Sequence, residues 1–209
     1  NILLYDNKKK IIEKKIKENK NIFFVNKLKN IPKIKFDFVF LTLKIHHLNL
    51  FIIKSITKFV DDKTAIIPPC TSIPFWFSKN SDFNNYGKII NTKNIIGMTM
   101  WISATMVRPG FVKINHTQRG YPLKEINKKM KYKANKLREM INIKSTSPKI
   151  HNIKSEIFIK SLNSLAFNSI AVLFKKTNKE IKNDKKLIDK IYKIMKEGEE
   201  IIFKMKIGL

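Results

Sequence analysis

Cysteine and arginine are nearly absent from the sequence. Cys70 is the only cysteine, and Arg108, Arg119 and Arg138 are the only arginines. A single cysteine excludes an intramolecular disulfide and a zinc site built from cysteines, and it favours a reducing, cytoplasmic setting. The apolar runs 36–43 and 95–107 are too short or too polar to span a bilayer. We therefore expect no membrane association, and no secretory signal is visible at the first residues.

The scarcity of arginine also bears on the charge. The formal net charge is +27, which by itself suggests a nucleic-acid partner. Proteins that bind nucleic acid favour arginine for bidentate contacts, whereas the excess here is lysine spread over nearly every segment. Lysine, isoleucine and asparagine are encoded by A/T-rich codons. We therefore attribute the excess of lysine to the base composition of the genome and expect these lysines to lie on solvent-exposed faces. On this interpretation we expect no nucleic-acid partner.

The four histidines do not have the spacing of a metal site. His46 and His47 are adjacent and would project about 100° apart on a helix. His116 and His151 are isolated in the sequence. We therefore expect no metal.

Hydrophobic periodicity predicts strands alternating with helices, followed by helices alone. The expected strands are 1–5, 22–25, 36–43, 64–67 and 95–107, the last returning as a hairpin over 111–115 at the edge of the sheet. The expected helices are 8–19, 45–59, 133–143, 155–174 and 184–205. This order predicts an α/β fold in which a Rossmann-like parallel sheet domain, residues 1–147, precedes an all-helical domain, residues 148–209. A cleft between two such domains would hold a cofactor and a small substrate.

Five segments, in order, resemble the ketopantoate reductase (2-dehydropantoate 2-reductase) family. They are FVFLTLKIHH (38–47), TAIIPPCTSIPFWF (64–77), GMTMWISATMVRPGFV (97–112), IFIKSLNSLAFNSIAVL (157–173) and the stretch 179–209. The resemblance covers nearly the whole chain, and the fourth segment is the most specific. It implies that the sequence lacks the family's first strand with its G-x-G-x-x-G turn and the distal helices that carry a substrate-binding Ser and Glu. We therefore expect a chain truncated at both ends, which binds its cofactor poorly.

Lys160 matches the catalytic lysine of the family. Reduction of a 2-keto acid requires a cation or proton donor at the carbonyl oxygen, where charge develops. Ile157, Phe158 and Ile159 precede Lys160, and an apolar setting lowers the pKa of a lysine. The alternative is a solvated lysine among many others.

The resemblance assigns substrate contacts to the same helix. Asn168 lies about two turns after Lys160 and matches a family Asn that binds substrate. Ser164 occupies the position of another family Asn, a departure that bears on specificity. Either residue could instead serve only in packing or at the surface.

Four residues are implied at the cofactor. Lys44 follows a strand at the end where ligands bind in open α/β sheets. Thr71 stands where the family commonly has Asn, and Ala104 matches a small residue beside the cofactor. Asp6 stands where many members have an Arg that binds the 2′-phosphate of NADPH. A carboxylate would repel that phosphate, so Asp6 favours NADH over NADPH, although it could also cap a helix.

The resemblance implies reduction of 2-dehydropantoate to pantoate with NADPH or NADH, in pantothenate and coenzyme A biosynthesis. The substrate partner is then a small 2-keto acid, and a homodimer is compatible with the sequence. Three alternatives stay open: a related reductase of another 2-keto acid, an inactive fragment, and a basic nucleic-acid-binding protein.

Overall fold

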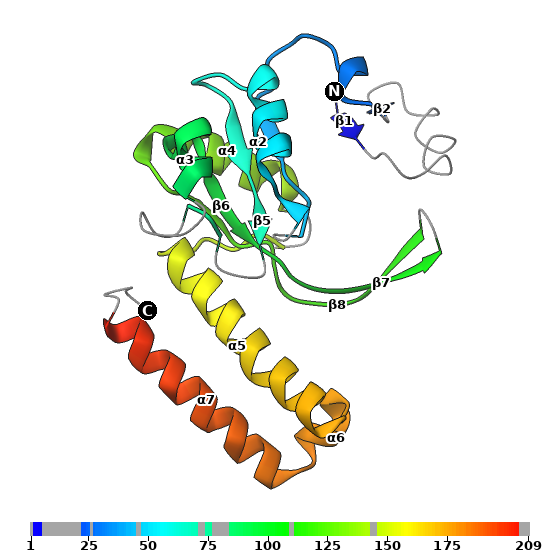
Figure 1. The fold of residues 1–209 in the computed structure, drawn as a ribbon, viewed down its shortest axis with the longest axis vertical. Coiled ribbons are helices and arrows are strands. Elements are labelled where there is room, and N and C mark those ends of the chain that lie inside the picture. The colour runs from blue at the N-terminus through cyan, green and yellow to red at the C-terminus, as the bar shows by residue number, and fades with distance from the viewer. Residues whose placement is uncertain are drawn as a thin grey trace.

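The computed structural model describes residues 2–5, 22–25, 27–44, 47–70, 74–76, 84–108, 111–142 and 146–204. The chain forms a sheet-containing body, a projecting hairpin and a long pair of helices (Figure 1). The helix predicted over 8–19 lies outside the described residues.

Parallel pairing dominates the strands of the body. Within the body β3 (Phe38–Phe40) pairs in parallel with β4 (Ala65–Ile67). Strands β1 (Ile2–Tyr5) and β2 (Ile22–Val25) also pair in parallel, but they form a two-stranded sheet of their own apart from the body (Figure 1). A parallel bridge from Ile66 to Ile95 continues the arrangement towards β6 (Ile96–Thr99). Strand β6 pairs in parallel with β5 (Pro69–Cys70) and antiparallel with β9 (Leu123–Glu125). The predicted mixture of parallel strands and helices is confirmed.

Alternate residues of the central strands enter two different cores. Ile66 and Ile95 pack in one core with residues of α2 (Leu50–Ile56) and of the long helix α5 (Ile153–Phe174). Ala65, Ile67 and Ile96 pack in the other core with residues of α4 (Lys131–Ile141). Because successive side chains of a strand point to opposite faces, these strands are covered on both sides.

Strand β3 is less covered than its apolar sequence predicted. Phe40 remains 42% exposed, and the strand is shorter than the predicted range 36–43. A strand is present within the predicted range 36–43, but its residues are only partly buried. In the described part of the chain β3 has a hydrogen-bonded strand on one side only, which is β4.

The predicted long strand 95–107 is two strands with different partners. Strand β6 ends at Thr99, and β7 (Trp101–Arg108) begins after Met100. Among the described strands β7 pairs with β8 (Phe111–Gly120) alone. The hairpin β7–β8 therefore projects from the body instead of extending the sheet (Figure 1), and β9 lies beside β6 at the position predicted for the hairpin. Register shifts along β7 bend the ribbon away from the sheet.

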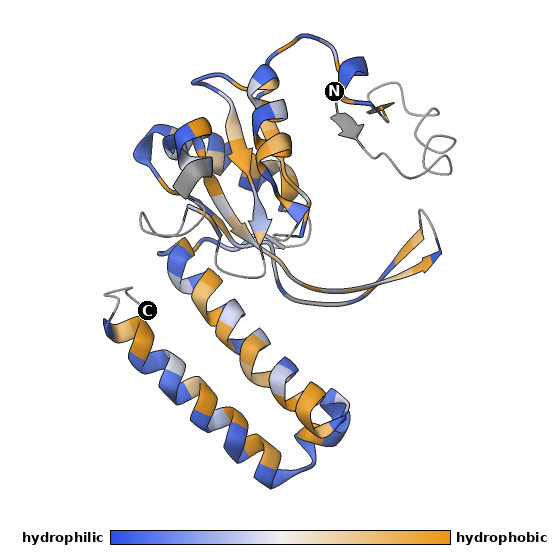
Figure 2. Cartoon of the chain, viewed as in Figure 1, coloured by the Kyte–Doolittle hydropathy of each residue, from blue (hydrophilic) through white to orange (hydrophobic). Residues whose placement is uncertain are grey.

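The C-terminal part is helical, as predicted. Helix α5 is followed by the short α6 (Asn178–Lys182) and by α7 (Lys185–Lys204), which runs back along α5 (Figure 1). Apolar residues form bands along both long helices (Figure 2), and Ala166, Ile170 and Ile191 share a buried cluster. The domain boundary at residues 147 and 148 stays a prediction.

Helix α5 also bears on the membrane expectation. By length and composition alone it could cross a membrane, a criterion that core helices of soluble proteins also meet. Sequence inspection missed this helix as a candidate because it considered only shorter runs. In this structure α5 contacts α7, β6 and β9.

Candidate functional site

A polar stripe runs along α5. Glu156, Lys160, Ser164 and Asn168 follow one another at intervals of four residues, so they share one face of the helix. Leu162 and Ala166, which lie on another face, are buried. The structure thus brings the three predicted residues Lys160, Ser164 and Asn168 into one row.

Lys160 lies against an aromatic ring of the hairpin. Its Nζ is 4.5 Å from the centroid of the Trp101 ring, a cation–π distance. Burial lowers the pKa of Lys160 below the ordinary value for a lysine, which makes its ammonium a stronger acid. Lys160 is therefore partly buried, as its apolar sequence neighbours suggested, and part of its surroundings is Trp101 of β7, which is distant in sequence.

One helical turn before Lys160, a carboxylate is buried beside the base of the hairpin. The Arg119 guanidinium on β8 donates a hydrogen bond to the Glu156 carboxylate. The Glu156 side chain is 10% exposed. Burial raises the pKa of Glu156, and the opposing effect of the Arg119 charge does not reverse that direction.

The other two substrate residues differ in accessibility. Ser164 is half-buried and Asn168 is exposed. Along the axis they lie about 6 and about 12 Å from Lys160, given a rise of about 1.5 Å per residue. A lysine, a hydroxyl and an amide in this row offer donors to the carbonyl and carboxylate of a small acid.

The carboxyl ends of the parallel strands meet at one edge, where open α/β sheets bind ligands. Lys44 follows β3 there and is exposed, and its carbonyl accepts a hydrogen bond of 2.8 Å from the His47 amide. Cys70 ends β5 at the same edge, where its thiol donates to the Met98 carbonyl. Burial raises the pKa of Cys70 to about 12, so its thiol stays protonated and unreactive at neutral pH.

The remaining cofactor residues are placed only in part. Ala104 is exposed on β7 and pairs with Ile114. Its position along the hairpin puts it about 10 Å beyond Trp101, since a strand rises about 3.3 Å per residue. Asp6 and Thr71 lie outside the described residues, so their predicted roles stay predictions.

Two buried polar atoms lie where β6 passes into β7. The Thr99 hydroxyl and the Trp101 indole nitrogen have no hydrogen-bond partner among the described residues. Buried donors are normally satisfied, so these two could meet polar groups of a bound nicotinamide or substrate. This end of the sheet fits the reactive end of a dinucleotide, whereas the described residues include no Gly-rich turn for the pyrophosphate.

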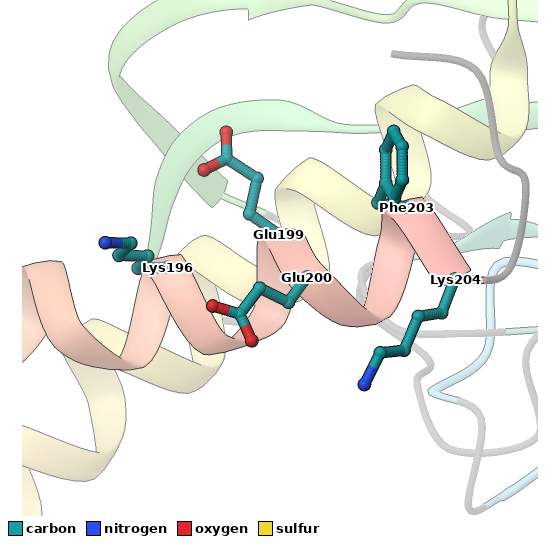
Figure 3. A pocket seen from close by; sticks show the side chains of 5 residues that line it. All are labelled: Lys196, Glu199, Glu200, Phe203 and Lys204. Carbon is teal, nitrogen blue, oxygen red and sulfur yellow. The ribbon is translucent and has the colours of Figure 1, made fainter.

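Two hollows of the described surface lie away from Lys160. One of about 390 Å³ is lined by the side chains of a single helix, α7: Lys196, Glu199, Glu200, Phe203 and Lys204 (Figure 3). Another of about 140 Å³ lies between β9 and the start of α5. Neither includes Lys160. Within the described ranges no three His, Cys, Asp or Glu side chains gather as metal ligands.

Sequence analysis missed Trp101, Arg119 and Glu156. Glu156 could have been found, because it precedes Lys160 by four residues and so shares its helical face. Nothing in the local sequence marks Trp101 or Arg119 as neighbours of α5, because the contact depends on where the hairpin leaves the body.

The fold is similar to solved reductases. A D-mandelate dehydrogenase in a ternary structure with NADH and anilino(oxo)acetate has a TM-score of 0.78 at 17% identity over 100% of this chain and 68% of its own. A ketopantoate reductase from Ralstonia eutropha JMP134 has a TM-score of 0.67 at 10% identity over 90% of this chain and 58% of its own. A dimeric ketopantoate reductase from Staphylococcus aureus has a TM-score of 0.59 at 15% identity over 85% of this chain and 68% of its own.

In contrast, the sequence itself matches no family model and no curated protein. The chain spans between 57% and 68% of the length of the similar solved proteins. At identities of 10–17% these likenesses establish the fold, which is that of ketopantoate reductases and D-mandelate dehydrogenase.

Proposed function

We propose that this chain is part of a nicotinamide-dependent reductase that acts on a small 2-keto acid, with 2-dehydropantoate as the first candidate substrate. The observation that carries the proposal is the position of Lys160, half-buried beside Trp101 on the same face as Ser164 and Asn168. The fold shared with ketopantoate reductases supports the same reaction class.

In the proposed reaction the Lys160 ammonium donates a hydrogen bond to the carbonyl oxygen of the substrate and then a proton. Its lowered pKa makes this transfer easier than from an ordinary lysine. Ser164 and Asn168 would hold the carboxylate and neighbouring hydroxyl groups of the substrate. A bound nicotinamide would supply the hydride, held by Lys44, Thr71 and Ala104, with Asp6 at the ribose favouring NADH.

A second candidate substrate is an aromatic 2-keto acid. The Trp101 ring beside Lys160 offers an aromatic surface near the expected carbonyl position. The similar D-mandelate dehydrogenase was solved with anilino(oxo)acetate, which carries an aromatic ring. Rates with 2-dehydropantoate and with 2-oxo-2-phenylacetate, measured on the product of the complete reading frame with each nucleotide, would separate the two candidates.

Replacement of Lys160 tests the reaction class. We expect Lys160→Ala to lower kcat by about 10²-fold or more, because the substrate carbonyl oxygen loses its proton donor. The variant should keep the wild-type fold. Lys179→Ala, at an exposed lysine of α6, is the matched control and should leave kcat unchanged. A Lys160→Ala enzyme with nearly full turnover would remove Lys160 from the mechanism.

The wider setting is also proposed. A homodimer is supported by the dimeric ketopantoate reductase of similar fold. A cytoplasmic location, and the absence of a membrane or nucleic-acid partner, rest on composition alone and stay predictions.

The DNA upstream of the Asn1 codon tests the expected truncation, since a frame encoding a strand and G-x-G-x-x-G would complete a dinucleotide-binding unit.

A further inference from the structure

The base of the β7–β8 hairpin is fixed to the body by backbone packing. Trp101 pairs with Gly120 where the two strands leave the body. Gly120 has a φ of +63° and lies so close to the Thr146 carbonyl that a side chain there would collide with it. The neighbouring Tyr121 amide also donates a hydrogen bond to that carbonyl. Trp101 is thus held on a strand whose starting point has little freedom.

An ion pair fixes the same base to α5. Arg119 precedes Gly120 and donates to the buried Glu156 carboxylate. Glu156 lies one helical turn before Lys160 on the same face. The hairpin base and the Lys160 segment of α5 are therefore joined independently of Trp101 itself.

The Gly120 packing and the Arg119–Glu156 ion pair hold the two elements together, and the Trp101 ring of one faces the Lys160 ammonium of the other. Lysine has a long flexible side chain, and its head group would otherwise sample many rotamers. A ring 4.5 Å from Nζ attracts the cation through its face and occupies one side of it. The ammonium has three donors, so those turned away from the ring stay available for other partners.

We propose that Trp101 is a positioning residue for Lys160, holding the ammonium where it meets the substrate carbonyl. This inference rests on the proposed reductase function and adds to it a residue of the hairpin. In this arrangement Trp101 does not touch the reacting atoms. It acts by fixing the location of the acid, and a small displacement of a catalytic group can cost a large factor in rate.

The contact can be measured without any activity. Reductive ¹³C-methylation labels lysines and keeps their charge, and Lys160→Arg identifies the Lys160 signal. In the complete protein we expect that signal to lie upfield of the other lysines, because methyl groups over an indole face experience its ring current. Trp101→Leu should return it to the position of ordinary lysines. Phe111→Leu is the matched control, since it removes the Arg108–Phe111 contact at the far end of the same hairpin.

Kinetics then test the role. We expect Trp101→Leu to lower kcat about tenfold or more with little change in KM, and Trp101→Phe, which keeps a ring, to restore most of kcat. Phe111→Leu should leave both unchanged. Circular dichroism checks the fold, and if Trp101→Leu does not fold, the wild-type signal and Trp101→Phe decide.

The outcomes separate the two proposals. An active enzyme with an unshifted Lys160 signal, or with full kcat in a folded Trp101→Leu variant, would overturn the role of Trp101 alone. A shifted signal in a complete protein that reduces no 2-keto acid would overturn the proposed function, and the role of Trp101 in it.

Discussion

Lys160 lies among groups that act on its ammonium in opposite directions. Burial favours the neutral amine, whereas the face of the Trp101 ring favours the cation. The nearby Glu156 carboxylate is already paired with Arg119. A lysine in this setting releases its proton more readily than a solvated lysine, as an acid in catalysis requires.

Gly120 provides a test at the residue scale. We expect Gly120→Ala to lower the free energy of unfolding by about 2 kcal/mol, because it strains a left-handed backbone conformation and drives a Cβ into the Thr146 carbonyl. Urea denaturation followed by circular dichroism measures the change. The reverse exchange on the paired strand, Ala104→Gly, is at an exposed position and should cost less. Equal losses for the two variants would contradict the packing at the hairpin base.

Helix α5 ends at a residue in the left-handed backbone conformation, which a lysine does not favour. Lys175 has a φ of 51°, in the left-handed region, and its amide bonds back to the carbonyls of Ala171 and Val172. The next helix begins with a capping box formed by Thr177 and Glu180. The turn that returns the chain towards α7 is therefore set by local hydrogen bonds.

Replacement of Lys175 tests this turn. We expect Lys175→Gly to raise the free energy of unfolding by about 0.5–1 kcal/mol, because glycine adopts the left-handed conformation without the steric cost of a Cβ. Lys193→Gly, at an exposed position within α7, is the control and should lower it by about 1 kcal/mol. Thermal and urea denaturation measure both. A loss of stability in Lys175→Gly would mean that the helix ends differently in solution.

The hairpin is an element whose exposure stands out. Five large apolar residues along it are each more than 40% exposed: Met106, Val107, Phe111, Val112 and Ile114. A two-stranded ribbon is only marginally stable alone in water. The contacts that Gly120, Arg119 and Trp101 make at the base of the hairpin are therefore the ones that keep the hairpin ordered.

For the whole molecule, the charge of +27 opposes compactness. We expect the Tm to rise when NaCl is increased from about 0.05 to about 0.5 M, because the Debye length shortens to a few ångströms and repulsion between lysines is screened. Differential scanning fluorimetry measures this change.

A charge variant provides the control. Helix α7 has no acidic residue in its first turn, so Lys186→Glu places a carboxylate where the helix dipole favours it. This variant should start from a higher Tm and gain less from salt. A Tm that is flat or falls with salt in the wild type would show that the lysines do not destabilise the fold.

The sequence by itself predicted the elements that depend on local pattern. The helices around α4, α5 and α7 and the strands β1, β2 and β4 follow from periodicity, which neighbouring residues determine. The row of Lys160, Ser164 and Asn168 follows equally, because spacing along one helix fixes a shared face.

Tertiary structure alone decided the rest. The run 95–107 is continuous in its apolar pattern, yet it divides at Met100 because β6 pairs within the sheet and β7 pairs with β8. Trp101 reaches Lys160, and Arg119 reaches Glu156, across long separations in sequence. Such contacts depend on how the hairpin and α5 pack on the body, and no local pattern of residues encodes that packing.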